Sequence, residues 1–171
     1  MIIIADSGST KTDWCLLEGA QAACVRTVGM NPYFQSEEEM AQTLQTQLRP
    51  AVTDAKAVEA VYFYGAGCAS AAVNEKVARA IASFFPVTIE VQSDLMAAAR
   101  ALCGREAGIA CIMGTGSNSC AYDGKQITAH VPSMGYILGD EGSGAVLGKL
   151  LVGDVVKHQL SLSVEEAFYQ E

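Results

Sequence analysis

The hydrophobic pattern of the first hundred residues predicts an alternation of strands and helices. Short apolar runs at 1–4, 14–17 and 22–28 are typical of three strands that follow one another through tight turns. After them, two segments with apolar residues at helical spacing alternate with apolar runs at 58–64 and 86–91. The predicted order is three strands, then helix, strand, helix, strand and a last helix, which is an α/β layout with a mixed sheet.

The first of these helices carries a strong start signal. Ser36 and Glu39 are spaced as a capping box, in which each side chain satisfies the backbone N–H of the other residue. Met40, Leu44 and Leu48 then recur every fourth residue and form one apolar face. The spacing predicts a helix that packs against the sheet through this face.

The strand pattern restarts after about one hundred residues. An apolar run at 108–113 is followed by a Gly/Ser/Thr turn at 114–119 and by further strand-like runs. The same arrangement opens the chain, and a repeated pattern of this kind indicates an internal duplication. We therefore expect one lobe over residues 1–104 and the beginning of a second, similar lobe over residues 105–171.

The turn between the first two predicted strands has the composition of a phosphate-binding turn. Apart from Lys11, residues 7–12 are glycine or hydroxyl-bearing, and successive backbone N–H groups in such a turn can close on a phosphate. Asp6 ends the preceding strand, where a carboxylate can hold a hydrated Mg²⁺. The spacing fits neither a Walker A loop nor a dinucleotide-binding motif, and a plain polar hairpin turn remains the alternative. The similar turn at 114–119 makes the pair a stronger indication of phosphate binding than either turn alone.

Two more carboxylates lie near the amino ends of predicted helices. Ser93 is a good N-cap for a helix that Asp94 opens, and Asp140 precedes a helix predicted around 146–155. The helix dipole favours a carboxylate at either place for structural reasons alone. Their positions therefore leave open whether these side chains serve the fold or a site.

The composition narrows the classes of function. The formal net charge is −8 without a Lys/Arg cluster, which argues against nucleic-acid binding. The six cysteines include no C-x-x-C pair and mostly stand in apolar or small-residue settings, so we expect reduced core thiols and no metal cluster. The chain shows no bilayer-length apolar run and no signal peptide, so we expect a cytoplasmic protein without a membrane partner.

Several motifs together resemble the BadF/BadG/BcrA/BcrD ATPase family, and within it the N-acetylglucosamine kinases. The matching segments are residues 6–12, 29–32, 93–94, 114–118 and 139–143. Their order and spacing agree along nearly the whole chain, which is far more specific than any single motif. The resemblance implies the two-lobed actin/Hsp70/sugar-kinase fold, with a ribonuclease-H-like sheet in each lobe and the active site between them.

The resemblance also implies roles for individual residues. ATP and Mg²⁺ would be the cofactors, and an amino sugar such as N-acetylglucosamine would receive the γ-phosphate on a hydroxyl. Asp6 would hold the Mg²⁺, and Asp94 would be the general base. The phosphate-binding residues would be those of the two turns: Ser9, Thr10, Lys11, Gly114, Thr115 and Gly116. The ligands of the sugar hydroxyls would be Asn31, Asn118 and Asp140.

The resemblance leaves other functions to weigh. Family members that activate 2-hydroxyacyl-CoA dehydratases carry iron–sulfur cysteines near the positions of Asp94 and Asp140, and this chain has no cysteine there. A non-catalytic sugar or nucleotide sensor stays open as an alternative, although the retained Asp6 and Asp94 argue against a decayed site. Met134 stands where the sugar kinase has a Trp, so the identity of the sugar is left open.

The carboxy-terminal part reads as less complete than the first lobe. Its last predicted helix starts at Ser163, and the chain stops at Glu171. We expect the 171-residue chain by itself to phosphorylate sugar little or not at all, because catalysis of phosphoryl transfer depends on positioning. We also expect apolar surface on this second lobe to favour self-association as a homodimer.

Overall fold

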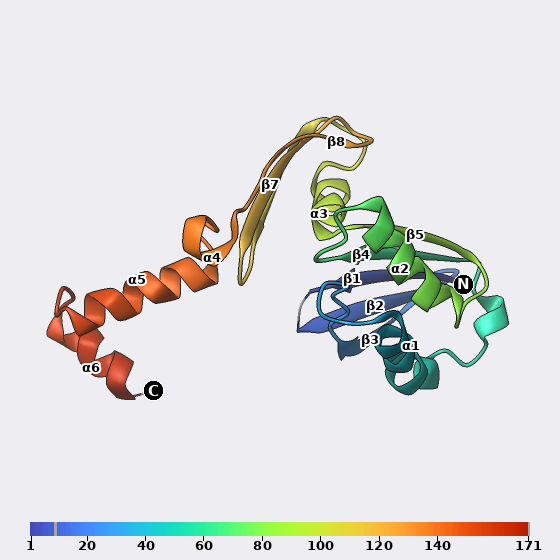
Figure 1. The fold of residues 1–171 in the computed structure, drawn as a ribbon, viewed down its shortest axis with the longest axis horizontal. Coiled ribbons are helices and arrows are strands. Elements are labelled where there is room, and N and C mark those ends of the chain that lie inside the picture. Colours follow the sequence, from blue (N-terminus) through green and yellow to red (C-terminus); the bar gives the residue numbers. More distant parts are fainter. Residues whose placement is uncertain (9, 171) are drawn as a thin grey trace. The chain divides into compact units, whose positions relative to one another are not determined.

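The computed structural model describes residues 1–8 and 10–170 and forms two compact units, Met1–Ala97 and Ala98–Glu171. Figure 1 shows the order of the elements along the chain. The division falls inside helix α3 (Asp94–Cys103). The domain limit expected from the sequence therefore stays a prediction, and each unit is described by itself.

The first unit is built on a five-stranded mixed sheet. Its strands are β1 (Ile2–Ser7), β2 (Lys11–Glu18), β3 (Gln21–Val28), β4 (Ala60–Gly65) and β5 (Thr88–Ser93). Their order across the sheet is β3-β2-β1-β4-β5, in which β1, β2 and β3 pair antiparallel while β4 and β5 run parallel to β1. The predicted α/β class and mixed sheet are confirmed for this unit.

The helix after β3 starts where the sequence predicts it. α1 (Glu37–Thr43) has Ser36 as its N-cap, and the reciprocal hydrogen bonds between Ser36 and Glu39 complete the capping box. The chain continues through a π-helical turn, η1 (Leu44–Leu48), into a 3-10 turn at Arg49–Ala51. The fixed backbone angle of proline suits the first turn of a helix, so Pro50 is accommodated there.

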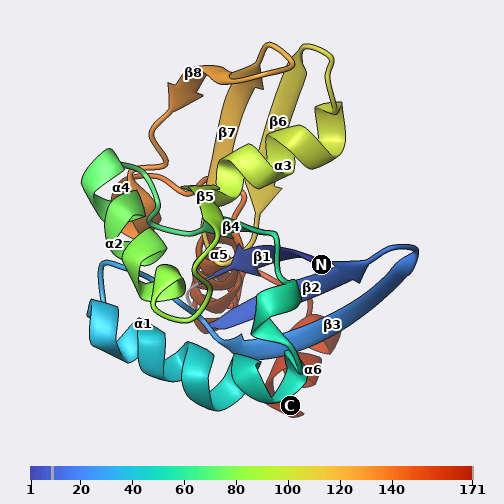
Figure 2. The ribbon, with the colours of Figure 1, turned by 90° about the vertical axis from the view of Figure 1, so that its right-hand side faces the viewer.

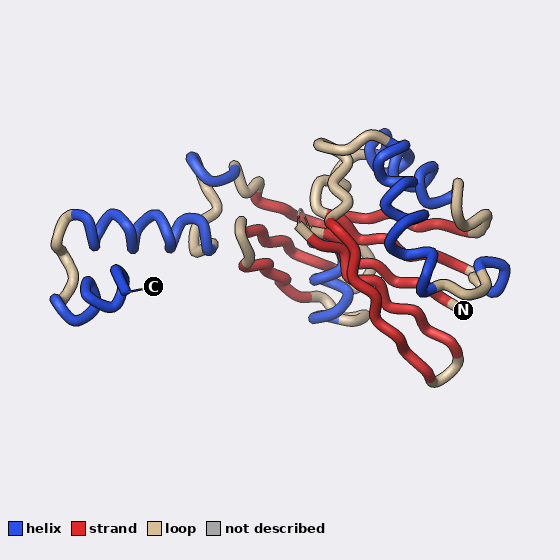
Figure 3. The backbone as a smooth tube through the Cα atoms, turned by 90° about the horizontal axis from the view of Figure 1, so that it is seen from below, coloured by secondary structure: helices blue, strands red, loops and turns tan. Residues whose placement is uncertain are grey.

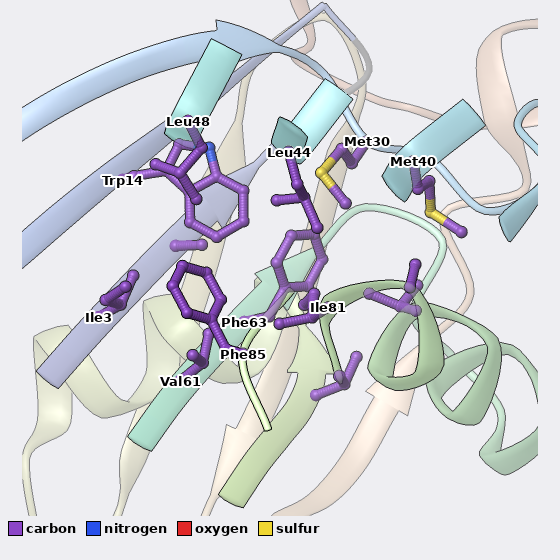
Figure 4. Packing of buried hydrophobic residues seen from close by; sticks show 14 of the residues in the cluster. Ile3, Trp14, Met30, Met40, Leu44, Leu48, Val61, Phe63, Ile81 and Phe85 are labelled. Atoms are coloured by element: carbon purple, nitrogen blue, oxygen red, sulfur yellow. The ribbon is translucent and has the colours of Figure 1, made fainter. Parts of the chain in front are cut away.

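The core of the first unit lies between one face of the sheet and the helices α1 and α2 (Ala71–Ala82) (Figure 2). Alternate strand residues such as Ile3 point into it, because successive side chains of a strand face opposite sides. Figure 4 shows the rings of Trp14 and Phe63 side by side, with their centroids 5.9 Å apart. The indole Nε1 of Trp14 donates a hydrogen bond of 3.0 Å to the Thr27 hydroxyl, so this buried ring leaves no polar atom unpaired.

The three parallel strands of this sheet end together. Ser7 of β1, Gly65 of β4 and Ser93 of β5 are aligned in register. Asp6 precedes Ser7, and Asp94 follows Ser93 as the first residue of α3. Open α/β sheets bind ligands at the carboxyl ends of their strands, so a ligand site is expected at this edge.

The second unit begins with a three-stranded antiparallel sheet in the order β6-β7-β8. Its strands are β6 (Gly108–Met113), β7 (Ser117–Tyr122) and β8 (Ile127–Val131), and its helices after α3 are α4 (Gly135–Leu138), α5 (Gly144–Val156) and α6 (Leu162–Gln170). Figure 3 shows the strands and helices of both units by colour. The pairing of β6, β7 and β8 repeats that of β1, β2 and β3, as the predicted internal duplication requires.

The carboxy-terminal helices differ from the prediction in two details. The short helix α4 was not anticipated, because only four residues form it and no periodic pattern can build up. α6 begins one residue before the expected cap, since the Ser161 carbonyl already accepts the N–H groups of Val164 and Glu165. Ser163 therefore lies inside the first turn, and the prediction that it caps the helix is wrong.

Helix α5 is apolar on several sides, with exposed Leu147, Leu150, Val152 and Val156. A helix that is apolar all round is normally buried. The expected self-association would rest on this surface, and it stays a prediction. No helix within the described part of the chain has the length and apolar character needed to cross a membrane.

Candidate functional site

Two carboxylates lie at the carboxyl edge of the first sheet. Asp6 is exposed on the face opposite Ile3, and Asp94 is half-buried at the start of α3. Burial raises the pKa of Asp94, the N–H of Leu95 opposes that rise, and the nearby charge of Asp6 raises the pKa further. The charge of Asp6 therefore disfavours ionisation of Asp94, as expected for two carboxylates near one site.

The N-cap of α3 is provided by Ser93 rather than by Asp94. The Ser93 hydroxyl accepts the N–H of Met96 at 3.3 Å, in the usual capping geometry. Asp94 accepts the N–H of the next residue, Leu95, at 2.8 Å. The capping alternative for Asp94 is weakened, because the helix already has a cap without it.

A buried thiol accompanies Asp94. Burial, and then the charge on Asp94, raise the pKa of Cys68 to about 11. Cys68 is therefore a neutral, small apolar neighbour at ordinary pH rather than a nucleophile.

Hydroxyl groups hold the first turn to the neighbouring loop. The buried hydroxyls of Ser7 and Thr12 lie 2.7 Å apart, and the N–H of Met30 donates to the Ser7 hydroxyl at 3.0 Å. The N–H of Gly8 closes the hairpin onto the Lys11 carbonyl at 2.9 Å. This network fixes the turn directly after Asp6, whereas the phosphate role predicted for Ser9 lies outside the described residues.

Removing this network is expected to weaken the first unit. Ser7→Ala leaves the buried Met30 N–H without its acceptor and removes the Ser7 contact of the Thr12 hydroxyl, which still donates to the Val28 carbonyl. We expect the free energy of unfolding to fall by about 1–3 kcal/mol. Urea unfolding followed by Trp14 fluorescence measures it. Thr46→Ala, which removes an exposed helix hydroxyl, is the control and should change stability by less than about 0.5 kcal/mol. Equal effects of the two substitutions would show that the Ser7 network is not structural.

Lys11 is held by a carboxylate that sequence reasoning missed. Asp13 lies directly opposite Asp6 in the register of β1 and β2. Its carboxylate accepts Arg26 Nε at 2.6 Å and Lys11 Nζ at 2.9 Å, and these two cations lower the pKa of Asp13 to about 2. Exposed ion pairs of this kind are weak, so Lys11 remains available to a stronger anion. The period of two between Lys11 and Asp13 in a strand is the signal that could have predicted the pair.

Asn31 has a clear structural task in the loop after β3. It is buried, its Oδ1 accepts the N–H of Tyr33 at 3.0 Å, and its own N–H donates to Gln35 Oε1 at 2.9 Å. Gly67 passes close by with a left-handed φ of 83°, and a Cβ there would come within 2.9 Å of the Asn31 Oδ1. The contacts place Asn31 at the organising centre of its loop, and a sugar contact by it stays a proposal.

The second Gly/Ser/Thr turn, in the second unit, is anchored by a helix. The N–H of Gly114 closes the turn onto the Gly116 carbonyl at 2.9 Å. The first N–H groups of α5, from Gly144 and Ala145, donate to the carbonyls of Gly114 and Thr115 at 2.9 and 3.2 Å. The turn is therefore fixed from behind, as a preformed anion cradle requires.

Asp140 supports the same turn. It has a left-handed φ of 61°, is buried, and accepts the N–H of Ser117 on Oδ1 at 3.2 Å. A Cβ on Gly116 would lie 3.1 Å from Asp140 Oδ2, so glycine lets the turn and carboxylate pack closely. Asn118 lies on β7, where its Oδ1 contacts His130 Nε2 at 2.9 Å and accepts the N–H of Ser119. The second unit thus brings Asp140 to the turn and directs the Asn118 oxygen to β8.

The arrangement around Asp6 fits a magnesium ion. Within the described part of the chain no three or more His, Cys, Asp or Glu side chains gather as a metal cage. Mg²⁺ rarely needs such a cage, since it keeps several waters and uses one or two carboxylates together with phosphate oxygens. Asp6, exposed beside the phosphate-type turn, has the chemistry of such a ligand.

The comparisons with known proteins agree with this geometry. The profile of the BadF/BadG/BcrA/BcrD ATPase family matches residues 5–168. A structure from Porphyromonas gingivalis, described as a candidate N-acetylglucosamine kinase, is 49% identical with a TM-score of 0.93, over 99% of this chain and 61% of that protein. No curated protein sequence matches the chain significantly.

More distant structures share the fold. A candidate N-acetylglucosamine kinase from Chromobacterium violaceum is 20% identical with a TM-score of 0.72, over 99% of this chain and 62% of that protein. The ethanolamine utilization protein EutJ from Carboxydothermus hydrogenoformans is 13% identical with a TM-score of 0.55, over 99% and 61%. The chain spans about three-fifths of the length of these proteins. It has the actin-like ATPase fold and belongs to the BadF/BadG/BcrA/BcrD ATPase family.

Proposed function

We propose that this protein takes part in transfer of the γ-phosphate of ATP to a hydroxyl of an amino sugar such as N-acetylglucosamine. The observation that carries the proposal is the placement of Asp6 and Asp94 at the same carboxyl edge of the first sheet, beside a phosphate-type turn. Membership of an ATPase family and similarity to candidate N-acetylglucosamine kinases support the choice of donor and acceptor.

Asp94 is assigned the role of general base. Phosphoryl transfer needs a residue that orients the attacking hydroxyl and accepts its proton. Burial and the charge of Asp6 raise the pKa of Asp94, which makes its carboxylate a stronger base than an exposed one. Because Ser93 caps helix α3, the helix does not need Asp94 as its N-cap.

Asp6 and the two turns are assigned to the phosphates. Mg²⁺, when bound, would neutralise charge on the transferring phosphate, and Asp6 would hold it through a carboxylate oxygen or a bound water. Thr10 and Lys11 in the first unit, with Gly114, Thr115 and Gly116 in the second, would supply N–H groups and a cation to the phosphate oxygens. Lys11 would exchange its weak contact with Asp13 for this stronger one.

Sugar recognition is assigned to Asn31, Asn118 and Asp140. Each carries oxygen atoms that can accept a sugar hydroxyl, and Asn31 and Asp140 are already fixed by backbone hydrogen bonds. Met134 lies exposed with a left-handed φ of 57° in the loop before α4. A flexible thioether at this position, instead of a flat aromatic ring, is expected to make the site less selective for one sugar ring.

Substitution of Asp6 tests the metal assignment on this chain directly. We expect Asp6→Ala to lower the affinity for ADP about tenfold when Mg²⁺ is present, because a charged contact of roughly 1.4 kcal/mol is lost. In EDTA the variant and the wild type should bind ADP equally. Isothermal titration calorimetry measures both affinities.

The control for that experiment is Asp13→Asn. Asp13 lies opposite Asp6 but is already paired with two cations, so its substitution should leave the effect of Mg²⁺ on ADP binding intact. An Asp6→Ala variant whose ADP affinity still rises normally with Mg²⁺ would remove Asp6 from the metal site.

Activity is best measured in a chimera, because the chain spans three-fifths of its relative. In the chimera this chain replaces the matching part of the Porphyromonas gingivalis protein, which 49% identity and a TM-score of 0.93 make structurally compatible. The parent protein serves as the reference in the same assay. The residues of this chain are then tested in a full-length setting.

A further inference from the structure

The six cysteines are distributed differently from the sequence-based expectation. Cys68 and Cys120 are buried, as core thiols should be, but Cys24 and Cys111 are exposed. The expectation of core burial is therefore wrong for Cys24 on β3 and Cys111 on β6. Within the described part of the chain, the face of each strand that carries the cysteine is exposed. Cys15 is half-buried on that same face of the first sheet.

Cys15 and Cys24 are direct cross-strand partners. The antiparallel register of β2 and β3 places Cys15 opposite Cys24, so both side chains point to the same face. Directly opposed residues have Cα atoms about 4.5 or about 5.5 Å apart, depending on the type of pair. Both values lie inside the range of about 4.4–6.8 Å that a disulfide spans without backbone movement.

The two thiols also interact. Desolvation raises the pKa of Cys15, and the adjacent Cys24 sulfur raises it further. A neighbouring sulfur has such an effect only at short range, which agrees with the register. The pair is therefore held side by side in the reduced protein, with one sulfur exposed to a reactant.

We propose that Cys15 and Cys24 are a dithiol site that forms a reversible cross-strand disulfide by exchange with a small disulfide such as oxidised glutathione. The thiolate of one cysteine attacks the small disulfide, forms a mixed disulfide and releases one small thiolate. The second cysteine, as thiolate, attacks the protein-bound sulfur, closes the Cys15–Cys24 bond and releases the second small thiol. Two protein thiols are oxidised and one small disulfide is reduced to two thiols, with both protons passing to those products.

Three of the other cysteines are poorer sites for this reaction. Burial and the charge of Asp94 raise the pKa of Cys68 to about 11, so its thiolate is scarce. Cys120 is buried and its pKa is raised chiefly by that burial. Cys111 faces Ser119 across the β6–β7 pair, so its direct strand partner offers no thiol.

The disulfide would fasten the edge of the first sheet. Cys15 and Cys24 lie two residues along their strands from Asp13 and Arg26, on the same face of β2 and β3. Linking them closes a short loop of the unfolded chain and ties the edge strand β3 to β2. We expect the thermal midpoint of the first unit to rise by about 5 °C on oxidation and to fall back on reduction.

Peptide mapping of the whole chain tests the linkage. The folded protein is incubated with oxidised glutathione, its remaining thiols are blocked, and it is cleaved after Lys11, Glu18 and Arg26 without reduction. These cuts separate the two cysteines, so the disulfide should appear as peptides 12–18 and 19–26 joined covalently. The same treatment in urea should lose the preference for this pair, because the register no longer holds them together.

Single substitutions sharpen the test. Cys15→Ser and Cys24→Ser should each leave the other cysteine as a mixed disulfide with glutathione, and neither should show the thermal shift. Cys111→Ser is the matched control and should keep both the linked peptides and the shift. Absence of the joined peptides in the folded wild type, or a linkage dominated by any other pair, would overturn the proposal. So would a thermal shift that persists in Cys24→Ser.

Discussion

Asp94→Asn in the chimera is expected to lower kcat by about 10²- to 10⁴-fold, the usual contribution of a positioned general base. The asparagine keeps the size of the side chain and an oxygen that can accept the Leu95 N–H, but it cannot take the proton of the sugar hydroxyl. KM for ATP and for the sugar should change little. Steady-state kinetics with a coupled assay for ADP gives both parameters.

The stability of the same variant gives an independent readout. Burial and the charge of Asp6 raise the pKa of Asp94 in the folded state, so ionised Asp94 costs stability at pH 7. Asp94→Asn should therefore be more stable than wild type at pH 7. The difference should shrink as the pH falls through the raised pKa of folded Asp94, and it should vanish below the ordinary aspartate pKa of about 4, where Asp94 is protonated in both the folded and the unfolded state. Urea unfolding of the 171-residue chain across this pH range measures it.

The control is Ser93→Ala, which removes the N-cap of α3 and leaves the base in place. It should cost about 1 kcal/mol of stability at every pH and leave kcat within a few-fold of normal. A normal kcat in Asp94→Asn would make Asp94 a structural residue only. Lower stability of Asp94→Asn at pH 7 would show that ionised Asp94 does not destabilise the folded protein.

Asp140→Ala is expected to have the second largest effect, because the residue supports a turn. Its loss leaves the N–H of Ser117 without its acceptor and removes the carboxylate packed on Gly116. We expect affinity for both Mg·ADP and the sugar to fall by about 5- to 150-fold, the range that 1–3 kcal/mol allows. The sequence alone suggested a sugar ligand, for which sugar affinity would fall more than nucleotide affinity. Calorimetry of the chimera with each ligand separates the two expectations.

Asn118→Ala provides the matched comparison in the same unit. Its oxygen contacts His130 and the Ser119 N–H and makes no contact with the Gly114–Gly116 turn that the structure describes. Its substitution should lower sugar affinity and leave Mg·ADP affinity unchanged. Unchanged Mg·ADP affinity in Asp140→Ala would show that the carboxylate does not support a phosphate turn.

Much of the first unit could be predicted because its local signals agree with its packing. The capping box at Ser36 and Glu39, and the spacing of Met40, Leu44 and Leu48, gave a helix whose buried face is the one expected. The strand order in the chain followed from apolar runs separated by turns. These features depend on neighbouring residues, and a sequence displays neighbours directly.

The candidate site was predictable only in part, since it depends on contacts between distant segments. Asp6 and Asp94 are 88 positions apart, and only the parallel register of β1, β4 and β5 brings them to one edge. The pairing of Asp13 with Arg26 crosses from β2 to β3, and the support of Ser117 by Asp140 spans 23 residues. The left-handed backbone of Asp140 is a further feature that tertiary packing imposes, because a non-glycine residue rarely adopts it.

The exposure of the cysteines shows the same limit. Small-residue surroundings suggested buried thiols, yet on β2 and β3 it is the face of the strand that decides burial. Cys24 lies on the open face and Trp14 on the covered one, although both stand in apolar runs. A run with apolar residues on both sides of the strand does not reveal which face a helix will cover.

Identification of the reaction product tests the proposed phosphoryl transfer to a sugar. The chimera is incubated with Mg·ATP and N-acetylglucosamine, and the sugar is analysed by mass spectrometry and ³¹P NMR. We expect a sugar phosphate formed in equal amount to ADP in the wild type, and its near absence in Asp94→Asn. ATP hydrolysis without any phosphorylated sugar, across N-acetyl sugars and hexoses and with an active parent protein, would contradict it.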